Sequence, residues 1–231
     1  MSQLLTVNLA HPHAADYTAA DLTGIDKRPA DGSVAVAAPG PRGTAGSGVA
    51  GDTVGDLRDH GGDHQAVYAF ARKDLTAWEK ELGRELPNGV FGENLTTSGL
   101  DVNGALIGER WRIGESLVLE VTSARIPCRT FAGWLGEKGW VKRFTQAARP
   151  GAYLRVIEPG EIRAGDGIEV VSRPDHGVTV EFLFRALTAE PDLLPRVLDA
   201  GDALNPADAA TVRRRLESRE RAARPGSSPA V

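Results

Sequence analysis

The chain has 231 residues, of which 41% are hydrophobic and 25% charged, and its formal net charge at pH 7 is −4. This is the usual balance of a globular protein with enough apolar residues to bury a core, and the length suits one large domain or one domain with a small appendage. The negative charge argues against nucleic acid polymers and membrane surfaces as partners, because both attract a clustered positive field.

The start of the sequence, MSQLLTVNLAHPH, lacks the basic segment, the long apolar run and the cleavage site of a secretory signal. No apolar run reaches the roughly 18–20 residues needed to cross a bilayer. The single cysteine cannot form an intrachain disulfide and suits a reducing compartment. We therefore expect a cytoplasmic protein that does not enter a membrane.

The first fifty residues predict two short strands and two loops. Residues 2–9 alternate between apolar and polar side chains, which is typical of a half-buried strand. Residues 10–33 are polar and are predicted to form a loop, and residues 33–37 (SVAVA) a second strand. Residues 39–52 are rich in glycine and proline without periodicity, which predicts a loop or bulge.

A strand followed by a helix is predicted next. Residues 66–70 (AVYAF) are a β-like run. They lead into a helix over residues 74–82, in which Leu75 and Trp78 fall on one face. Gly83 is placed to end this helix.

The middle of the chain predicts paired strands on either side of a broken helix. Residues 109–128 are expected to form two strands around a turn at Gly114 and Glu115. Residues 131–149 predict a helix interrupted by three glycines. Residues 151–171 again predict two strands, with the turn at Pro159–Gly160.

The last part of the chain changes character. Three short helices are predicted, at residues 179–188, 191–200 and 205–222. Asn205 is a favourable N-cap and is followed by a proline at the first helical position. Residues 173–177 (RPDHG) suit a linker. We therefore expect one domain over residues 1–174 and a three-helix domain over residues 175–225.

Cys128 stands in the segment ARIPCRTF, with Arg125 and Arg129 close by. Pro127 cannot donate a ladder hydrogen bond, so the preceding strand is expected to end here and expose the thiol. Nearby guanidinium groups favour the thiolate, which is the form that binds metals and attacks electrophiles. A lone cysteine is more often a small buried apolar side chain, however, so this segment alone leaves both interpretations open.

Three further segments suggest ligand contacts. Residues 60–70 (HGGDHQAVYAF) place two glycines before a strand, where backbone N–H groups can approach an anion. Residues 91–115 (FGENLTTSGLDVNGALIGERWRIGE) are dense in glycine, asparagine and glutamate. Lys27 and Arg28 precede the strand at residues 33–37. Each signal is weak alone, because glycine clusters usually mark turns and charged loop residues are usually solvated.

In this order, the segments TGIDKRP, GVAGDTVGDLRDHGGDHQAVYAF, FGENLTTSGL, IGERWRIGE and RIPCRTF resemble the MOSC domain. They are most similar to its stand-alone bacterial branch, which is linked to detoxification of 6-N-hydroxylaminopurine. The resemblance covers roughly residues 20–171, and the helical tail resembles the small α-helical domain appended in that branch. It implies a mostly β (α+β) protein, with a β-barrel-like MOSC domain and a small C-terminal three-helix domain.

The resemblance also implies a molybdenum-pterin cofactor, molybdopterin, with Cys128 as the metal-ligating or sulfur-carrying residue. Soft sulfur ligands suit such a metal, and guanidinium groups match phosphate oxygens. The residues expected to take part in catalysis are Cys128, Arg125 and Asn94. The residues expected to bind the cofactor are Lys27, Arg28, His60, Gly61, Gly62, Asp63, Asn94 and Arg125.

By this resemblance the protein is an oxidoreductase that reduces small N-hydroxylated compounds. The sequence has neither a Rossmann glycine pattern after a strand nor an iron–sulfur cysteine set, so we expect a separate, flavoprotein-like reductase as electron donor. Two alternatives stay open: a carrier of the cofactor without turnover, and a protein that delivers persulfide sulfur from Cys128. No residue supports a pyridoxal phosphate site, and a homodimer stays open.

Overall fold

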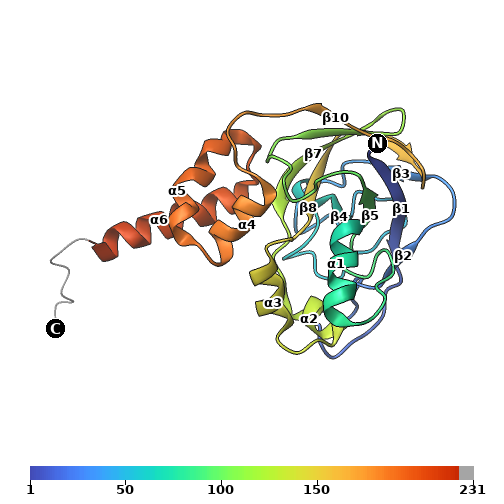
Figure 1. Ribbon diagram of the computed structural model, residues 1–231, viewed down its shortest axis with the longest axis horizontal. Helices are drawn as coiled ribbons and strands as arrows, with labels where there is room; N and C mark the ends of the chain where they lie inside the picture. Colours follow the sequence, from blue (N-terminus) through green and yellow to red (C-terminus); the bar gives the residue numbers. More distant parts are fainter. Residues whose placement is uncertain (224–231) are drawn as a thin grey trace.

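The structure, a computed structural model, describes residues 1–223 and combines a curved sheet with helices (Figure 1). The strands are β1 (Gln3–Ala10), β2 (Lys27–Pro29), β3 (Val34–Val36), β4 (Val67–Ala71), β5 (Leu95–Ser98), β6 (Arg110–Ile113), β7 (Leu117–Ala124), β8 (Ala152–Glu158), β9 (Gly160–Ile162) and β10 (Ile168–Ser172). The α-helices are α1 (Arg72–Leu82), α2 (Arg129–Leu135), α3 (Trp140–Ala147), α4 (Val180–Thr188), α5 (Leu194–Val197) and α6 (Pro206–Ala223). The shorter 3₁₀ helices are η1 (Asp63–Gln65), η2 (Pro191–Leu193) and η3 (Leu198–Ala203). The mostly β α+β class is confirmed.

The main sheet has eight strands in the order β10-β6-β7-β8-β4-β5-β1-β2. Its neighbours are antiparallel except for β4 and β5, which run parallel with α1 in the connection between them. The amide of Leu4 donates to Asp166 O over 2.9 Å, and that of Ile168 donates to Ser2 O over 3.0 Å. These bonds join the start of β1 to the start of β10. The sheet therefore curls back on itself and is barrel-like without a regular closing ladder in residues 1–223.

The central strands and α1 follow the sequence pattern closely. All five residues of β4 and all eight of β7 are buried, as expected of strands that are covered on both faces. Leu75 and Trp78 of α1 are buried, and Gly83 ends the helix with a left-handed φ of 67°. Its N–H donates to Glu79 O over 2.8 Å, as in a glycine C-cap. The predicted strand at residues 66–70 and the helix after it are confirmed.

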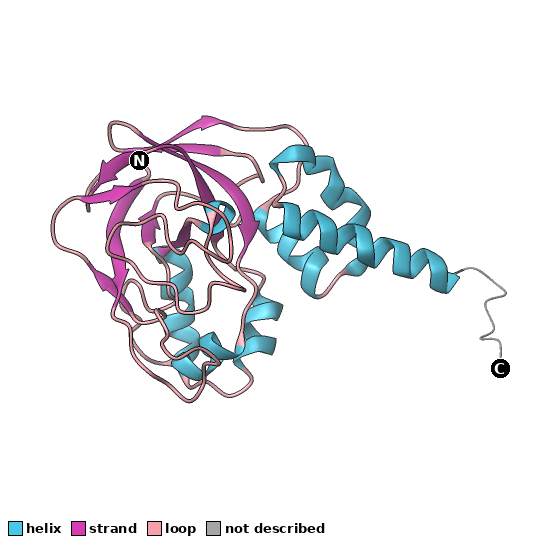
Figure 2. Cartoon of the chain, turned by 180° about the vertical axis from the view of Figure 1, so that it is seen from behind, coloured by secondary structure: helices cyan, strands magenta, loops and turns pink. Residues whose placement is uncertain are grey.

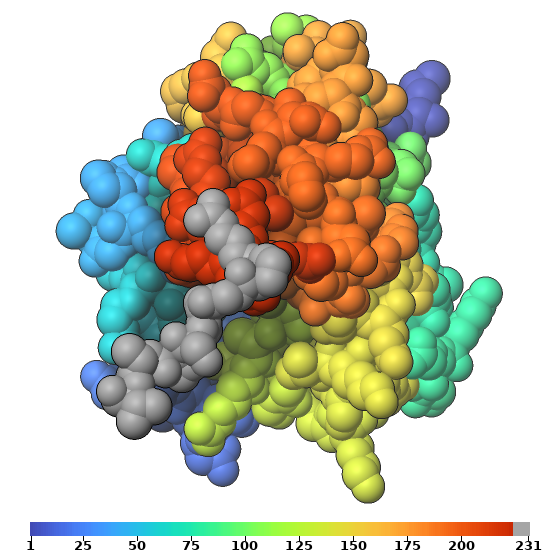
Figure 3. Space-filling model, turned by 90° about the vertical axis from the view of Figure 1, so that its left-hand side faces the viewer, coloured from blue at the N-terminus to red at the C-terminus, as the bar shows by residue number. Residues whose placement is uncertain are grey.

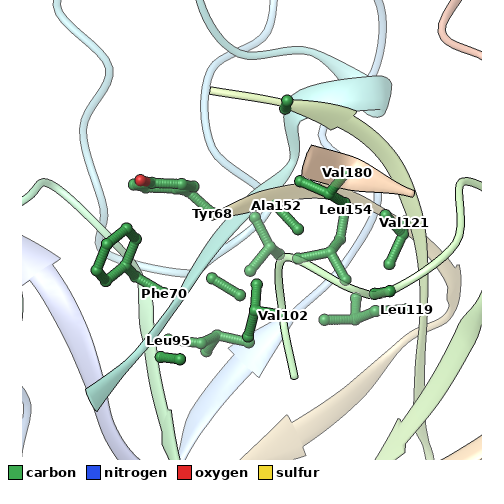
Figure 4. Close-up of a cluster of buried hydrophobic side chains, with 14 of the residues drawn as sticks. Tyr68, Phe70, Leu95, Val102, Leu119, Val121, Ala152, Leu154 and Val180 are labelled. Atoms are coloured by element: carbon green, nitrogen blue, oxygen red, sulfur yellow. The ribbon is translucent and has the colours of Figure 1, made fainter. Parts of the chain in front are cut away.

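Two groups of buried side chains hold the body together. Side chains from several strands meet in an apolar cluster that includes Leu95, Leu119 and Leu154 (Figure 4). Aromatic rings form a second group beside it, where Trp78 and Trp140 lie 4.6 Å apart between centroids. Phe91, Phe131 and Phe144 complete this aromatic group. The rings join α1, α2 and α3 to the segment before β5.

The C-terminal helices pack against one end of the sheet (Figures 1 and 3). Val180 of α4 joins the apolar cluster of the strands (Figure 4), and its amide donates to Ala105 O over 2.9 Å. The three predicted helical segments are present, the second as a run of short turns from η2 to η3. The division into domains 1–174 and 175–225 stays a prediction, and its last two residues lie outside the described part of the chain.

Two strands lie where the sequence predicted none. β2 falls within residues 10–33, which were expected to be a loop, and β5 is formed by LTTS after the FGEN motif. Both are short strands that pair with β1, and short polar segments carry little alternation from which to predict a strand. Among residues 1–223, no helix combines the length and apolar character that spanning a membrane requires.

Candidate functional site

A cavity of about 360 Å³ opens on the side of the sheet where long connections gather. Figure 2 shows these connections crossing in front of the strands. The cavity is lined by the loop after β1, the loop before η1, β4, the segment before β5, the start of β8, and the turn from β7 into α2. Segments far apart in the sequence therefore meet in this one space.

Cys128 lies at the wall of this cavity, where the chain leaves β7 and enters α2. β7 ends at Ala124, as the proline before the cysteine predicted, and Cys128 has extended backbone at the N-cap of α2. Burial of the thiol opposes its ionisation. The His60 side chain, the Arg125 guanidinium and the Phe131 N–H outweigh burial and lower the pKa of Cys128 to about 6. Half-buried Cys128 is therefore mostly thiolate at neutral pH.

Arg125 is a buried cation at the same wall, with only 5% of its surface exposed. Its guanidinium carbon lies 4.3 Å from the centroid of the Phe131 ring and 5.0 Å from that of the Tyr68 ring. Within residues 1–223 no carboxylate forms an ion pair with it, and its Nε has no hydrogen-bond partner. Aromatic rings compensate a buried charge only in part, so this guanidinium suits an anionic ligand.

Lys27 and Asn94 meet at Asp52, in another part of the cavity. The Lys27 ammonium pairs with the Asp52 carboxylate, and Asn94 Nδ2 donates to the other carboxylate oxygen over 2.8 Å. Asn94 Oδ1 accepts from the N–H of Tyr68 over 3.1 Å. Burial lowers the pKa of Lys27, although Asp52 opposes that effect. The charge of Lys27 is thus neutralised by Asp52, whereas Arg125 has no such partner in the described part of the chain.

Of the remaining predicted residues, His60 and Gly61 line the cavity, whereas Arg28, Gly62 and Asp63 lie outside its lining. Arg28 is exposed and forms an ion pair with Asp26 over 2.7 Å.

Gly62 and Asp63, the two residues after Gly61, form hydrogen bonds with the loop at residues 40–46. Gly62 donates its N–H to Gly46 O over 2.9 Å, and Asp63 Oδ1 accepts from the N–H of Gly40 over 2.8 Å. A Cβ at Gly62 would lie 2.6 Å from the Arg42 Cα. The second glycine therefore permits close backbone packing, and its N–H is not available to an anion.

Many residues of the cavity lining were not among the predicted site residues, and Asp52, Gln65, Tyr68 and Tyr153 are those whose polar groups matter most here. Tyr68 and Tyr153 are opposite each other on β4 and β8, with ring centroids 5.2 Å apart. The Tyr68 hydroxyl donates to Pro150 O over 2.7 Å. Gln65 has a buried Oε1 without a hydrogen-bond partner in the described residues. The strand at residues 66–70 was predicted, but its pattern does not show which face carries the cavity.

These groups suit a ligand that brings anionic oxygen atoms and a soft metal. A thiolate is a soft ligand, and a buried guanidinium binds phosphate or carboxylate oxygens. Among residues 1–223, no three His, Cys, Asp or Glu side chains are grouped so as to hold a metal ion. A metal at Cys128 would therefore need further ligands from a bound organic molecule.

Comparisons with known proteins identify the family of this chain. A model of the MOSC domain matches residues 56–169. The protein YflK of Bacillus subtilis (strain 168) is 35% identical over 183 residues, which cover 79% of each chain. A Gibberella moniliformis protein named Reductase is 31% identical over 119 residues, which cover 50% of this chain and 21% of that protein.

The fold agrees as well. The crystal structure of YiiM from Geobacillus stearothermophilus matches with a TM-score of 0.75 and 24% identity, covering 94% of this chain and 100% of that one. The resemblance seen in the RIPC, FGEN and HGG segments is thereby confirmed, and the chain belongs to the MOSC-domain family.

Proposed function

We propose that this protein binds a molybdenum-pterin cofactor in the cavity and reduces small N-hydroxylated compounds there. The observation that carries the proposal is the juxtaposition of a thiolate, Cys128, with a buried guanidinium, Arg125, that lacks an ion-pair partner within residues 1–223. The MOSC family is associated with molybdenum cofactors in general. The fungal relative named Reductase supports an oxidoreductase over other classes of enzyme.

The residues of the cavity fit such a cofactor. Cys128 would supply the soft protein ligand to the metal, and the Arg125 guanidinium would bind anionic oxygens. Gln65 Oε1 is buried and has no hydrogen-bond partner among residues 1–223, so it is an acceptor suited to a ring N–H or amino group of a pterin. His60 and Gly61 would complete the wall beside the thiolate.

The proposed reaction converts R–NH–OH, two electrons and two protons into R–NH2 and water, with cleavage of the N–O bond. When bound, the cofactor supplies the two electrons. A separate, flavoprotein-like reductase replaces them, and protons come from solvent through the cavity mouth. Asn94 and Lys27 hold the Asp52 carboxylate in a fixed orientation at the wall, where it can accept a hydrogen bond from the substrate. The reductase partner and a cytoplasmic location are part of the proposal.

The first test compares the wild type with Cys128→Ala, and with Gly167→Ala as a control. A Cβ at Gly167 would meet nothing within 4 Å, and this glycine lies outside the cavity lining. We expect wild type and control to retain molybdenum and pterin after purification and to reduce 6-N-hydroxylaminopurine with a chemical electron donor. Cys128→Ala should lose the metal and the activity.

Other results would favour the alternatives or exclude a role for the thiolate. Bound cofactor without turnover by the wild type would indicate a carrier. One additional sulfur atom on Cys128, seen by mass spectrometry, would indicate persulfide transfer. Full molybdenum content and activity in Cys128→Ala would overturn the proposal.

A further inference from the structure

We propose that residues 13–23 form a lid that selects, by size, the molecules that reach Cys128. The identity of the selected substrate rests on the proposed function, whereas the lid rests on the contacts of this loop. Tyr17, Thr18, Ala19 and Leu22 all line the cavity from this one loop. Leu22 is 47% exposed, so this loop lies at the mouth of the cavity.

The base of the loop is firmly fixed. His13 and Thr23 exchange two backbone hydrogen bonds, with N···O distances of 3.2 and 2.9 Å. Beyond this bridge, a Cβ at Gly24 would lie 2.1 Å from Thr53 O, and one at Gly55 would lie 2.1 Å from Leu22 O. The backbone on both sides is thus in direct contact. The ends of the loop are therefore held in place by backbone contacts.

The tip of the loop is held mainly by its contacts with α2, the helix that begins next to Cys128. Arg129 Nη2 donates to Asp16 O over 3.3 Å. Tyr17 packs on Gly133 so closely that a Cβ there would lie 2.2 Å from the Tyr17 Cβ. The Tyr17 hydroxyl also bonds with His13 Nε2 over 2.9 Å.

The backbone of the tip makes no ladder with the body. Within residues 14–21 the described backbone hydrogen bond is local, from the N–H of Thr18 to Ala15 O. Segments that lack backbone bonds to their surroundings open at low free-energy cost. The Tyr17–Gly133 contact therefore fastens the tip to α2, and its loss should open the cavity without disturbing the wall around the thiol.

The consequence is a limit on substrate size. With the lid docked, the cavity of about 360 Å³ is near the lower end for small-molecule sites. A base within a polymer cannot enter a space of this size, so with the lid docked only free small molecules would reach Cys128. Enzyme lids commonly restrict access and exclude water in this way.

The test uses Cys128, the only cysteine in the chain, as a reporter in the protein without added cofactor. Alkylation by small iodoacetamide and by bulky fluorescein maleimide is followed by mass spectrometry, and each rate is divided by the rate of that reagent with free cysteine. Gly133→Ala displaces Tyr17 without removing a cavity side chain. Tyr17→Ala abolishes the same contact by removing the tyrosine side chain. Gly167→Ala is the matched control, since its added methyl group meets nothing.

In the wild type and the control, we expect the normalised rate with fluorescein maleimide to be at least about tenfold lower than that with iodoacetamide, because the open form of the lid is a minor state. Gly133→Ala and Tyr17→Ala should each raise the bulky rate about tenfold and leave the iodoacetamide rate nearly unchanged. Equal normalised rates for both reagents in the wild type would overturn the proposal. An unchanged rate ratio in both variants, with folding verified by circular dichroism, would overturn it too. Failure of the reductase proposal would affect none of these rates.

Discussion

Cys128 and Arg125 depend on each other at the scale of single residues. The thiol is ionised near neutral pH although burial disfavours its charge, and the guanidinium is one of the groups that reverse this effect. The guanidinium in turn has the rings of Phe131 and Tyr68 around it and no carboxylate partner in the described residues. Each charge therefore makes the other less costly to bury.

Replacing Arg125 should raise the pKa of Cys128. In Arg125→Met the loss of the nearby positive charge destabilises the thiolate, so the pKa should rise by about 1 or more from its value of about 6. The thiolate fraction at pH 7 then falls. The pH dependence of iodoacetamide alkylation measures this shift directly.

Arg129→Met is the matched control for this prediction. Arg129 also flanks Cys128 and lines the cavity, but it is exposed and is not among the groups that lower the pKa of the thiol. In Arg129→Met, we expect the midpoint of the pH dependence of Cys128 alkylation to stay near 6. Equal midpoints in Arg125→Met and Arg129→Met would contradict the conclusion that Arg125 lowers the pKa of Cys128.

The sequence predicted the residues of this site that belong to compact motifs. RIPC gave Arg125 and Cys128, and FGEN gave Asn94. Asp52 could not be found in this way, because it meets its partners only when loops distant in the sequence come together. Lys27 and Arg28 were not distinguished, because β2 places them on opposite faces and no strand was predicted there.

At the scale of one element, the turn before β5 depends on a buried carboxylate. Glu93 is 0% exposed and accepts from the Gly89 N–H over 2.6 Å, the Phe91 N–H over 3.0 Å and the Thr96 hydroxyl over 2.9 Å. The turn then presents Asn94 to the cavity. Glu93 is a positioning residue, because it is not among the residues that line the cavity.

Removing this carboxylate should destabilise the protein strongly. Glu93→Ala leaves three buried donors without an acceptor, and each costs roughly 1–3 kcal/mol. We expect a loss of at least about 3 kcal/mol in the free energy of unfolding, measured by urea denaturation.

The free energy of unfolding of Glu93→Gln should lie between those of Glu93→Ala and the wild type. The amide keeps one acceptor oxygen but places an NH2 group against a donor. Asp101→Asn is a control, since the Asp101 carboxylate is exposed and pairs with Lys73 at the surface. If Glu93→Ala lowered the free energy of unfolding no more than Asp101→Asn does, the turn would not depend on the carboxylate.

The prediction of elements succeeded where a hydrophobic pattern was long or where a glycine marked an end. Helix α1 and the strand pair β6–β7 are of this kind. The curling of the sheet was expected only through the family resemblance, because the bonds that join Leu4 to Asp166 connect positions far apart in the sequence. No local pattern encodes such pairing.

At the scale of the whole molecule, the helical tail and the sheet share buried surface. Val180, Leu183 and Phe184 of α4 belong to the same apolar cluster as the strands. The Phe184 ring also lies 6.1 Å from that of Phe144 on α3. Near the start of α6, Asp208 accepts a hydrogen bond from Ser123 on β7. The sheet and the helical tail therefore stabilise each other.

A chain truncated after residue 174 should for this reason lose cooperative folding. The shorter truncation exposes apolar surface of the sheet that α4 covers, and a short three-helix segment cannot bury a core of its own. In the full chain, Phe184→Ala alone should cost about 3–5 kcal/mol, because it leaves a cavity between α4 and α3. Urea denaturation followed by circular dichroism measures the stability of both variants. A cooperative transition at an unchanged midpoint for residues 1–174 would instead establish the body as an independent domain.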